Sequence, residues 1–178
     1  MESVQSESVL DVVIVGGGLV GMSLALALDR VPGLRTLAVE AQPAPSPQAP
    51  RWDERHFALG RASTLALDDL GVAYGAAGQH PIRRIHVSRR GAFGRSVLDA
   101  ATHGLPAFGQ IVPARQLAGA LEDAMARTTR LERWRPARLQ DFAAHDDHVA
   151  LNLRIGDETR QVQTRLLVAA DGTDSVIR

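Results

Sequence analysis

The chain has 178 residues, 45% of them hydrophobic, and its 20 basic and 20 acidic side chains give a formal net charge of zero. This length fits one domain, or one domain with part of another. Every basic residue is arginine and there is no cysteine, which excludes Schiff-base lysines, the P-loop, disulfides and thiolate metal sites, while the balanced charge gives no support for nucleic-acid binding.

The first forty residues predict a βαβ unit. Leu10–Val15 is a β-branched run, typical of a strand buried on both faces. Leu19–Arg30 is apolar and alanine-rich and predicts a helix, which Pro32-Gly33 ends, and Arg35–Glu40 predicts a second strand. This order favours a parallel pair of strands. Because glycines interrupt the apolar stretch and its upstream flank is acidic, we expect soluble structure rather than a signal peptide or membrane span.

The middle of the chain predicts loops, a helix and a β-rich segment. Residues 1–8 are polar and expected to fray, and the prolines of residues 43–50 predict a surface loop. A helix is expected over Ala62–Leu70, ended by Gly71. Residues 81–110 contain many glycines and favour irregular, β-rich structure.

The last third predicts a helix followed by strands. Pro113–Arg127 predicts a helix with proline in its first turn. Leu131–Arg165 indicates short strands joined by polar turns, because apolar and polar residues alternate there. Leu166–Ala170 predicts a final buried strand, which ends at Asp171-Gly172.

A glycine motif lies between the first strand and the first helix. The run from Gly16 to Gly21 fits G-x-G-x-x-G, and its place between a strand and a helix is the one that dinucleotide binding requires. Gly16 permits a tight turn, Gly18 lets a diphosphate approach the backbone, and Gly21 lets the helix pack closely on the strand. A glycine-rich turn without a ligand is the structural alternative.

Glu40 ends the second strand, 19 residues after Gly21. A carboxylate at this position accepts hydrogen bonds from the ribose hydroxyls of a dinucleotide and repels a 2′-phosphate. The motif and Glu40 together predict FAD or NAD rather than NADP. A solvated acid at a strand end is the alternative.

A second motif, near Arg178, favours FAD over NAD. Val168 to Arg178 holds an apolar strand, Asp171-Gly172, Ser175 and an arginine. This segment resembles the Asp-Gly motif of the single-component flavin-dependent aromatic hydroxylases. In that family the aspartate bonds the ribose of FAD, and the region is also implicated in NAD(P)H binding. The resemblance implies that Asp171 binds FAD and that NAD(P)H is a co-substrate.

Three residues between the motifs match family positions near the flavin. The resemblance gives Arg55 the role of a family arginine that approaches the cofactor. Gln110 and Arg115 lie where the family often places flavin contacts. The structural alternatives are a loop arginine, a loop amide and a first-turn helix arginine.

The segment from Pro81 to Gly94 indicates which branch of this family the chain resembles. This segment is similar to the ubiquinone-biosynthesis hydroxylases, and most like the 2-polyprenyl-6-methoxyphenol hydroxylase branch. The resemblance extends over nearly the whole chain from residue 10. Pro113 departs from the pattern, since many relatives carry a polar or acidic residue there. Family members are much longer, so we expect this chain to be the N-terminal portion of a longer enzyme.

The fold implied by this resemblance is α/β. It is a Rossmann-like FAD-binding domain of the p-hydroxybenzoate hydroxylase type, with part of a β-rich substrate domain. Residues 1–178 would form the N-terminal portion of the FAD-binding domain, residues 81–110 would contribute to the substrate domain, and the remainder would be absent. We expect such a fragment to expose apolar surface, retain FAD weakly and be inactive alone.

The implied activity is hydroxylation of a polyprenylated phenol in ubiquinone biosynthesis. NAD(P)H would reduce FAD, and O2 would then give a C4a-hydroperoxyflavin that transfers hydroxyl to the ring. Because the cofactor carries this chemistry, no catalytic side chain and no metal are assigned. The expected location is cytoplasmic, with peripheral contact at the inner membrane, where a polyprenyl substrate resides. A complex with other quinone-biosynthesis enzymes is a further expectation.

Other interpretations remain open at this point. They are another FAD oxidoreductase of the same fold, such as a prenyl reductase or halogenase, and a non-catalytic FAD- or NAD-binding fragment. A simple NAD dehydrogenase is a further one, against which the Asp171 motif counts. His145–His148 is interpreted as a solvated turn rather than a metal site. Arg83-Arg84 and Arg89-Arg90 are interpreted as solvated surface in preference to a lipid-binding patch.

Overall fold

The computed structural model describes residues 9–44, 55–75, 80–91, 93–173 and 175–177. The chain divides into two compact units. Unit 1 comprises Met1–Pro50 with Met125–Arg178, and unit 2 comprises Arg51–Ala124. The frayed terminus expected over residues 1–8 and most of the proline-rich loop lie outside the described residues.

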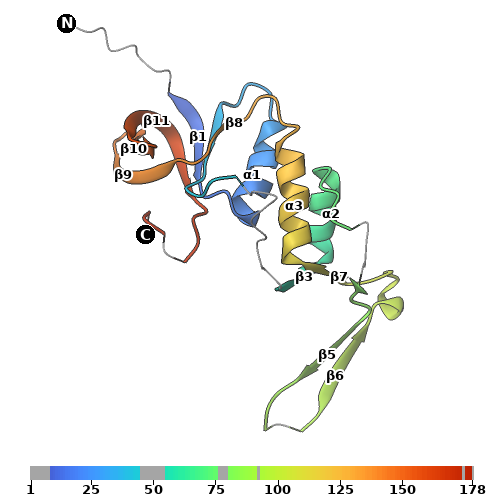
Figure 1. Cartoon of the computed structure of the whole chain (residues 1–178). Helices are drawn as coiled ribbons and strands as arrows, with labels where there is room; N and C mark the ends of the chain where they lie inside the picture. The colour runs from blue at the N-terminus through green and yellow to red at the C-terminus, as the bar shows by residue number, and fades with distance from the viewer. Residues whose placement is uncertain (1–8, 45–54, 76–79, 92, 174, 178) are drawn as a thin grey trace, which may run out of the picture. The chain divides into compact units, whose positions relative to one another are not determined.

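Unit 1 is built on a sheet whose described strands follow the order β8-β2-β1-β11-β10-β9. The strands are β1 (Leu10–Val15), β2 (Thr36–Val39), β8 (Glu132–Trp134), β9 (Arg138–Ala144), β10 (Val149–Ile155) and β11 (Glu158–Ala169). Pairing is parallel from β8 through β2 and β1 to β11, and antiparallel among β11, β10 and β9. β1 therefore lies inside the sheet, and its carboxyl end shares an edge with those of β2 and β11 (Figure 1).

The predicted βαβ unit is confirmed. Helix α1 (Leu19–Asp29) follows β1 and packs on β1 and β2, and Arg30 caps its end before Pro32-Gly33. Its buried residues face the sheet from one turn to the next, as an apolar, alanine-rich helix should: Gly21, Met22, Ala25 and Leu26. Val13 and Val15 join the main core cluster with Leu37 and Val39 of β2 and Leu151 of β10. This core fixes the ends of β1 and β2, from which the glycine turn and Glu40 project.

The end of the chain differs from the expectation of a separate buried strand. β11 runs without interruption over Glu158–Ala169, and Leu166 is 54% exposed. The reason is the register: pairing with β10 stops at Thr164, where pairing with β1 extends on to Ala169. Residues 165–169 of β11 thus have a strand on one side only within the described structure, and their side chains are partly exposed.

Unit 2 combines a small sheet, two helices and a hairpin. Its sheet has the order β3-β7-β4 in the described part of the chain. The elements are β3 (His56–Gly60), α2 (Arg61–Asp69), β4 (His80–Pro81), β5 (Arg84–Ser88), β6 (Arg95–Asp99), a 3-10 turn η1 (Ala101–His103), β7 (Gly109–Pro113) and α3 (Ala114–Met125, whose last residue belongs to unit 1). Helix α2 contacts β3 and β7. Tyr74 follows α2, and burial of its hydroxyl raises its pKa above the usual value. The β-rich interpretation of residues 81–110 is confirmed, and β5 and β6 form an antiparallel hairpin (Figure 1).

Pro113 lies in a strand rather than in the first turn of a helix. It is the last residue of β7, in register with His56 of β3, and α3 begins at Ala114. The cause is sheet pairing: the Ala114 N–H donates to the Arg55 carbonyl, which extends the β3–β7 ladder up to the helix start. Proline is tolerated there because its missing N–H falls at the end of the ladder.

In the part of the chain that the structure describes, no helix is long and apolar enough to cross a membrane.

Gly119 of α3 offers a test of this helix. Gly119→Ala is expected to raise the free energy of unfolding by about 0.5–1 kcal/mol, because glycine is the poorer helix former. A Cβ at this exposed position meets no atom within 4 Å. Urea titration followed by circular dichroism checks it. A lower unfolding midpoint would contradict the placement of Gly119 on an open helix face.

Candidate functional site

The turn between β1 and α1 depends on Gly16. Its φ is +110°, a conformation that residues with a Cβ rarely adopt. Its N–H donates to the Val39 carbonyl at 2.8 Å, which ties the turn to the end of β2. A Cβ here would also collide with the Ala170 carbonyl. Sequence and structure therefore agree on why glycine stands at this position.

The other two motif glycines have opposite surroundings. A Cβ on Gly21 would collide with the backbone carbonyl of Gly16, so the close packing of α1 on the turn depends on its absence. A Cβ on Gly18 would meet nothing within 4 Å. Gly18 precedes α1 and its carbonyl accepts the Met22 N–H at 2.9 Å. The space next to Gly18 at the N-terminus of α1 is therefore open, and an anion could bind the backbone N–H groups there.

Glu40 is held by the backbone around it. Its Oε2 accepts the Gly17 N–H and its Oε1 accepts the Gln42 N–H, both at 2.6 Å. Its own N–H donates to the Trp134 carbonyl, and its carbonyl accepts the Ala137 N–H. Each carboxylate oxygen keeps further lone pairs for a ligand. The carboxylate therefore has a fixed direction and links β2 to the glycine turn.

Asp171 lies just beyond β11 and orders the turn that follows it. Its Oδ2 accepts the Val176 N–H at 3.0 Å. Its Oδ1 is buried and has no hydrogen-bond partner. A buried acceptor without a partner is costly unless a ligand or water satisfies it. Thr36 Oγ1, in the buried strand β2, also lacks a partner, so the Asp171 oxygen indicates a ligand because Asp171 in addition lines a pocket.

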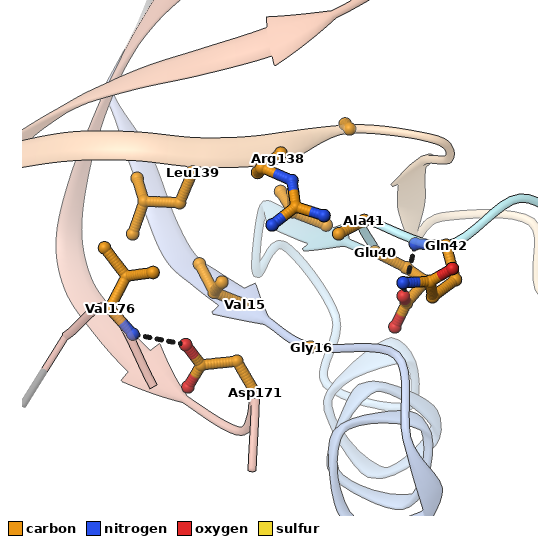
Figure 2. A pocket seen from close by; sticks show the side chains of 11 residues that line it. Val15, Gly16, Glu40, Ala41, Gln42, Arg138, Leu139, Asp171 and Val176 are labelled. Atoms are coloured by element: carbon orange, nitrogen blue, oxygen red, sulfur yellow. Dashed lines mark hydrogen bonds between the residues drawn. The ribbon is translucent and has the colours of Figure 1, made fainter. Parts of the chain in front are cut away.

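A pocket of about 320 Å³ brings three of the predicted residues together. Gly16, Glu40 and Asp171 line it, and Figure 2 shows the two carboxyl groups on opposite sides of the end of β1. The other lining residues are mainly apolar: Val15, Val39, Ala41, Gln42, Ala137, Arg138, Leu139 and Val176. A pocket at the carboxyl ends of parallel strands, with polar groups that converge between apolar side chains, is a usual place for a small-molecule site.

The remaining predicted residues lie in unit 2. Arg55 precedes β3, with its guanidinium 5.8 Å from the centre of the Phe57 ring, and Arg115 is exposed in the first turn of α3. The Arg55 carbonyl accepts the Ala114 N–H, so the backbones at Arg55 and Arg115 lie close together. Gln110 is on β7 opposite Leu59, and its Oε1 is buried without a partner. Like the Asp171 oxygen, this acceptor has no partner within the described structure, and a bound ligand could supply one.

Sequence reasoning missed Arg138 and Gln42. Arg138 begins β9, almost a hundred residues from Glu40 in the chain, and no motif marks it. Gln42 orients Glu40 through its backbone N–H, which any residue except proline would provide. Within the described ranges, no group of three or more His, Asp or Glu side chains is placed to hold a metal ion.

Comparison with known proteins identifies this arrangement. The family described as FAD binding domain matches residues 9–178. The chain belongs to this FAD-binding family. It is 34% identical over 170 residues to 3-demethoxyubiquinol 3-hydroxylase of Escherichia coli (strain K12), a match that covers 94% of this chain and 42% of that protein. The chain therefore spans less than half the length of this relative.

Solved structures agree on the fold of the FAD-binding family. The p-nitrophenol 4-monooxygenase PnpA of Pseudomonas putida DLL-E4 superposes with a TM-score of 0.73 at 20% identity, over 96% of this chain and 42% of that one. The rebeccamycin biosynthetic enzyme RebC, solved with reduced flavin, gives 0.63 at 33% identity, over 95% of this chain and 34% of that one. The expected α/β, Rossmann-like fold, present here as a portion of a longer type of protein, is confirmed.

The residues present fit FAD. The open space at Gly18 and the N-terminus of α1 suit a diphosphate, and the fixed Glu40 carboxylate suits ribose hydroxyls. The unpartnered Oδ1 of Asp171 needs a donor, which a ribose hydroxyl can be. Gly21 permits the approach of α1 that creates this site.

Proposed function

We propose that the pocket of unit 1 binds the adenosine half of FAD. Glu40 and Asp171 accept hydrogen bonds from its ribose, and the backbone at Gly18 receives the diphosphate. The observation that carries this proposal is that the unpartnered Oδ1 of Asp171 and the fixed carboxylate of Glu40 belong to residues that line one pocket. The glycine-permitted turn at Gly16 supports it.

We further propose that unit 2 supplies flavin contacts through Arg55, Gln110 and Arg115. The support is the orphaned Oε1 of Gln110, which can accept a hydrogen bond from a flavin N–H. The backbones at Arg55 and Arg115 lie close together, so both arginines project from the same part of unit 2. No side chain of this chain is assigned to proton transfer.

The longer protein to which this chain corresponds is proposed to be an FAD-dependent monooxygenase. It would hydroxylate a polyprenylated phenol in ubiquinone biosynthesis with NAD(P)H and O2. FAD supplies the activation of oxygen, while the protein orients the cofactor and excludes water. The support is the 34% identity to 3-demethoxyubiquinol 3-hydroxylase of Escherichia coli. Another FAD oxidoreductase of the same fold is the competing function.

The hairpin β5–β6 is proposed to belong to the substrate domain of that protein. Cross-strand neighbours Ile85 and Leu98, with Val87 beside them, give one face an apolar character. A two-stranded hairpin is marginal alone, so further structure on this face would stabilise it. For that longer protein, peripheral contact with a membrane and a complex with other quinone-biosynthesis enzymes stay proposals.

Two experiments test the proposed function. The first is a titration of FAD into this chain, followed by flavin fluorescence, for which we expect saturable, weak binding at one site. The second is a steady-state assay of the longer protein with NAD(P)H, O2 and a short-chain polyprenylphenol. Stoichiometric hydroxylated product supports the monooxygenase. Flavin reduction that yields only a saturated prenyl chain or a halogenated ring would establish the competing oxidoreductase instead.

Asp171→Asn separates the ligand role of this residue from its structural role. The amide oxygen can still accept the Val176 N–H, so unfolding should be unchanged within about 0.5 kcal/mol. The NH2 group would face the ribose in place of an acceptor, and FAD affinity should fall about tenfold. Urea unfolding and FAD titration measure the two effects. Unchanged FAD affinity would remove Asp171 from the site.

A further inference from the structure

Arg138 is a pocket residue with no assigned role. It is the first residue of β9, and its side chain lines the same pocket as Glu40 and Asp171. Figure 2 shows the guanidinium directed toward the space between Val15 and Glu40. Among the described residues, no hydrogen bond or ion pair engages this guanidinium. A cation at a pocket lined by both polar and apolar side chains is thus available to a ligand.

Two ligand groups could use this cation, a phosphate or the face of an aromatic base. The phosphate is disfavoured by position. The open backbone that suits a diphosphate is at Gly18, which does not line the pocket, whereas Arg138 does. Glu40 is also a lining residue, and its carboxylate would repel a phosphate brought close to it.

The side chains that line the pocket favour the aromatic base. Val15, Val39 and Leu139 give apolar surface on which a flat ring can lie. A guanidinium is planar, weakly hydrated and stacks readily on an aromatic face. With the ribose at Glu40, the base attached to it falls in the same pocket.

We propose that Arg138 stacks on the adenine ring of the bound cofactor and is a positioning residue for its adenosine half. This inference rests on the proposed binding of FAD in this pocket. In this role Arg138 contributes to the recognition of the adenine base and does not contact the phosphates. Because Arg138 is exposed, its replacement should not disturb the fold.

The test is a series of substitutions at Arg138, each titrated with FAD and with ADP. Arg138→Ala and Arg138→Lys are expected to lower both affinities about tenfold, since neither keeps a planar group. Arg138→Phe, which restores a flat face without charge, should stay within about threefold of the parent chain. Arg154→Ala is the matched control, because Arg154 pairs with Arg138 across the sheet but does not line the pocket.

The outcomes separate this inference from the function on which it rests. If Arg138→Lys kept the affinity and Arg138→Phe lost it, the guanidinium would be a charge partner of phosphate, and stacking would be overturned. Equal affinities for all variants would overturn any role of Arg138 while FAD binding stood. A parent chain that bound neither FAD nor ADP would overturn the proposed function and this inference together.

Discussion

Gly21→Ala is expected to lower the free energy of unfolding of unit 1 by about 3 kcal/mol, the upper end of the usual cost of overpacking. The added Cβ would collide with the backbone carbonyl of Gly16. A backbone atom cannot move aside as a side chain can, and Gly16 is itself held to Val39 by a 2.8 Å hydrogen bond. The substitution must therefore push α1 away from the turn, and FAD binding should be lost with it. Urea unfolding and FAD titration measure both effects.

Gly18→Ala is the matched control for this prediction. The two glycines lie three residues apart, and the same methyl group at Gly18 meets no protein atom within 4 Å. Unfolding should therefore change by less than about 0.5 kcal/mol. FAD affinity should still fall, about tenfold or more, because the methyl occupies space needed by the diphosphate. An unfolding midpoint for Gly21→Ala equal to that of Gly18→Ala would show that the packing argument is wrong.

Much of unit 1 could be predicted from local patterns. The β-branched run, the alanine-rich helix and Pro32-Gly33 predict β1, α1 and the end of α1 within a residue or two. The glycine spacing carries information because each position has its own steric demand, and the structure confirms those demands at Gly16 and Gly21. The roles of Glu40 and Asp171 in binding stay predictions, but the structure does bring both to one pocket with Gly16.

What the sequence missed depends on pairing between distant segments. The length of β11 and the exposure of Leu166 follow from where β10 stops pairing, which no local pattern encodes. Proline at residue 113 predicts the first turn of a helix. The Ala114 N–H instead donates to the Arg55 carbonyl, which continues the strand pairing up to the start of α3. Arg138 reaches the pocket because β9 returns beside β10, a result of sheet topology. Such features need the register of the sheet as well as the residue types.

Glu40→Gln is expected to weaken both the turn and the binding of FAD. Each carboxylate oxygen accepts one backbone N–H, from Gly17 and from Gln42. Glutamine has one acceptor oxygen, so its NH2 group would face one of these N–H donors. Loss of a hydrogen bond to a charged group costs about 1.5–3 kcal/mol, so we expect a loss near 2 kcal/mol of unfolding free energy.

The effect of Glu40→Gln on FAD should exceed its effect on the fold. The charge that accepts the ribose hydroxyls disappears and the side chain loses its fixed direction, so FAD affinity should fall about a hundredfold. Glu158→Gln is the matched control, because it removes an exposed carboxylate at the start of β11, outside the pocket. Titration of FAD into both variants, with urea unfolding in parallel, gives the comparison. If Glu40→Gln bound FAD as tightly as Glu158→Gln, Glu40 would only shape the turn, and the ribose would have to be held elsewhere.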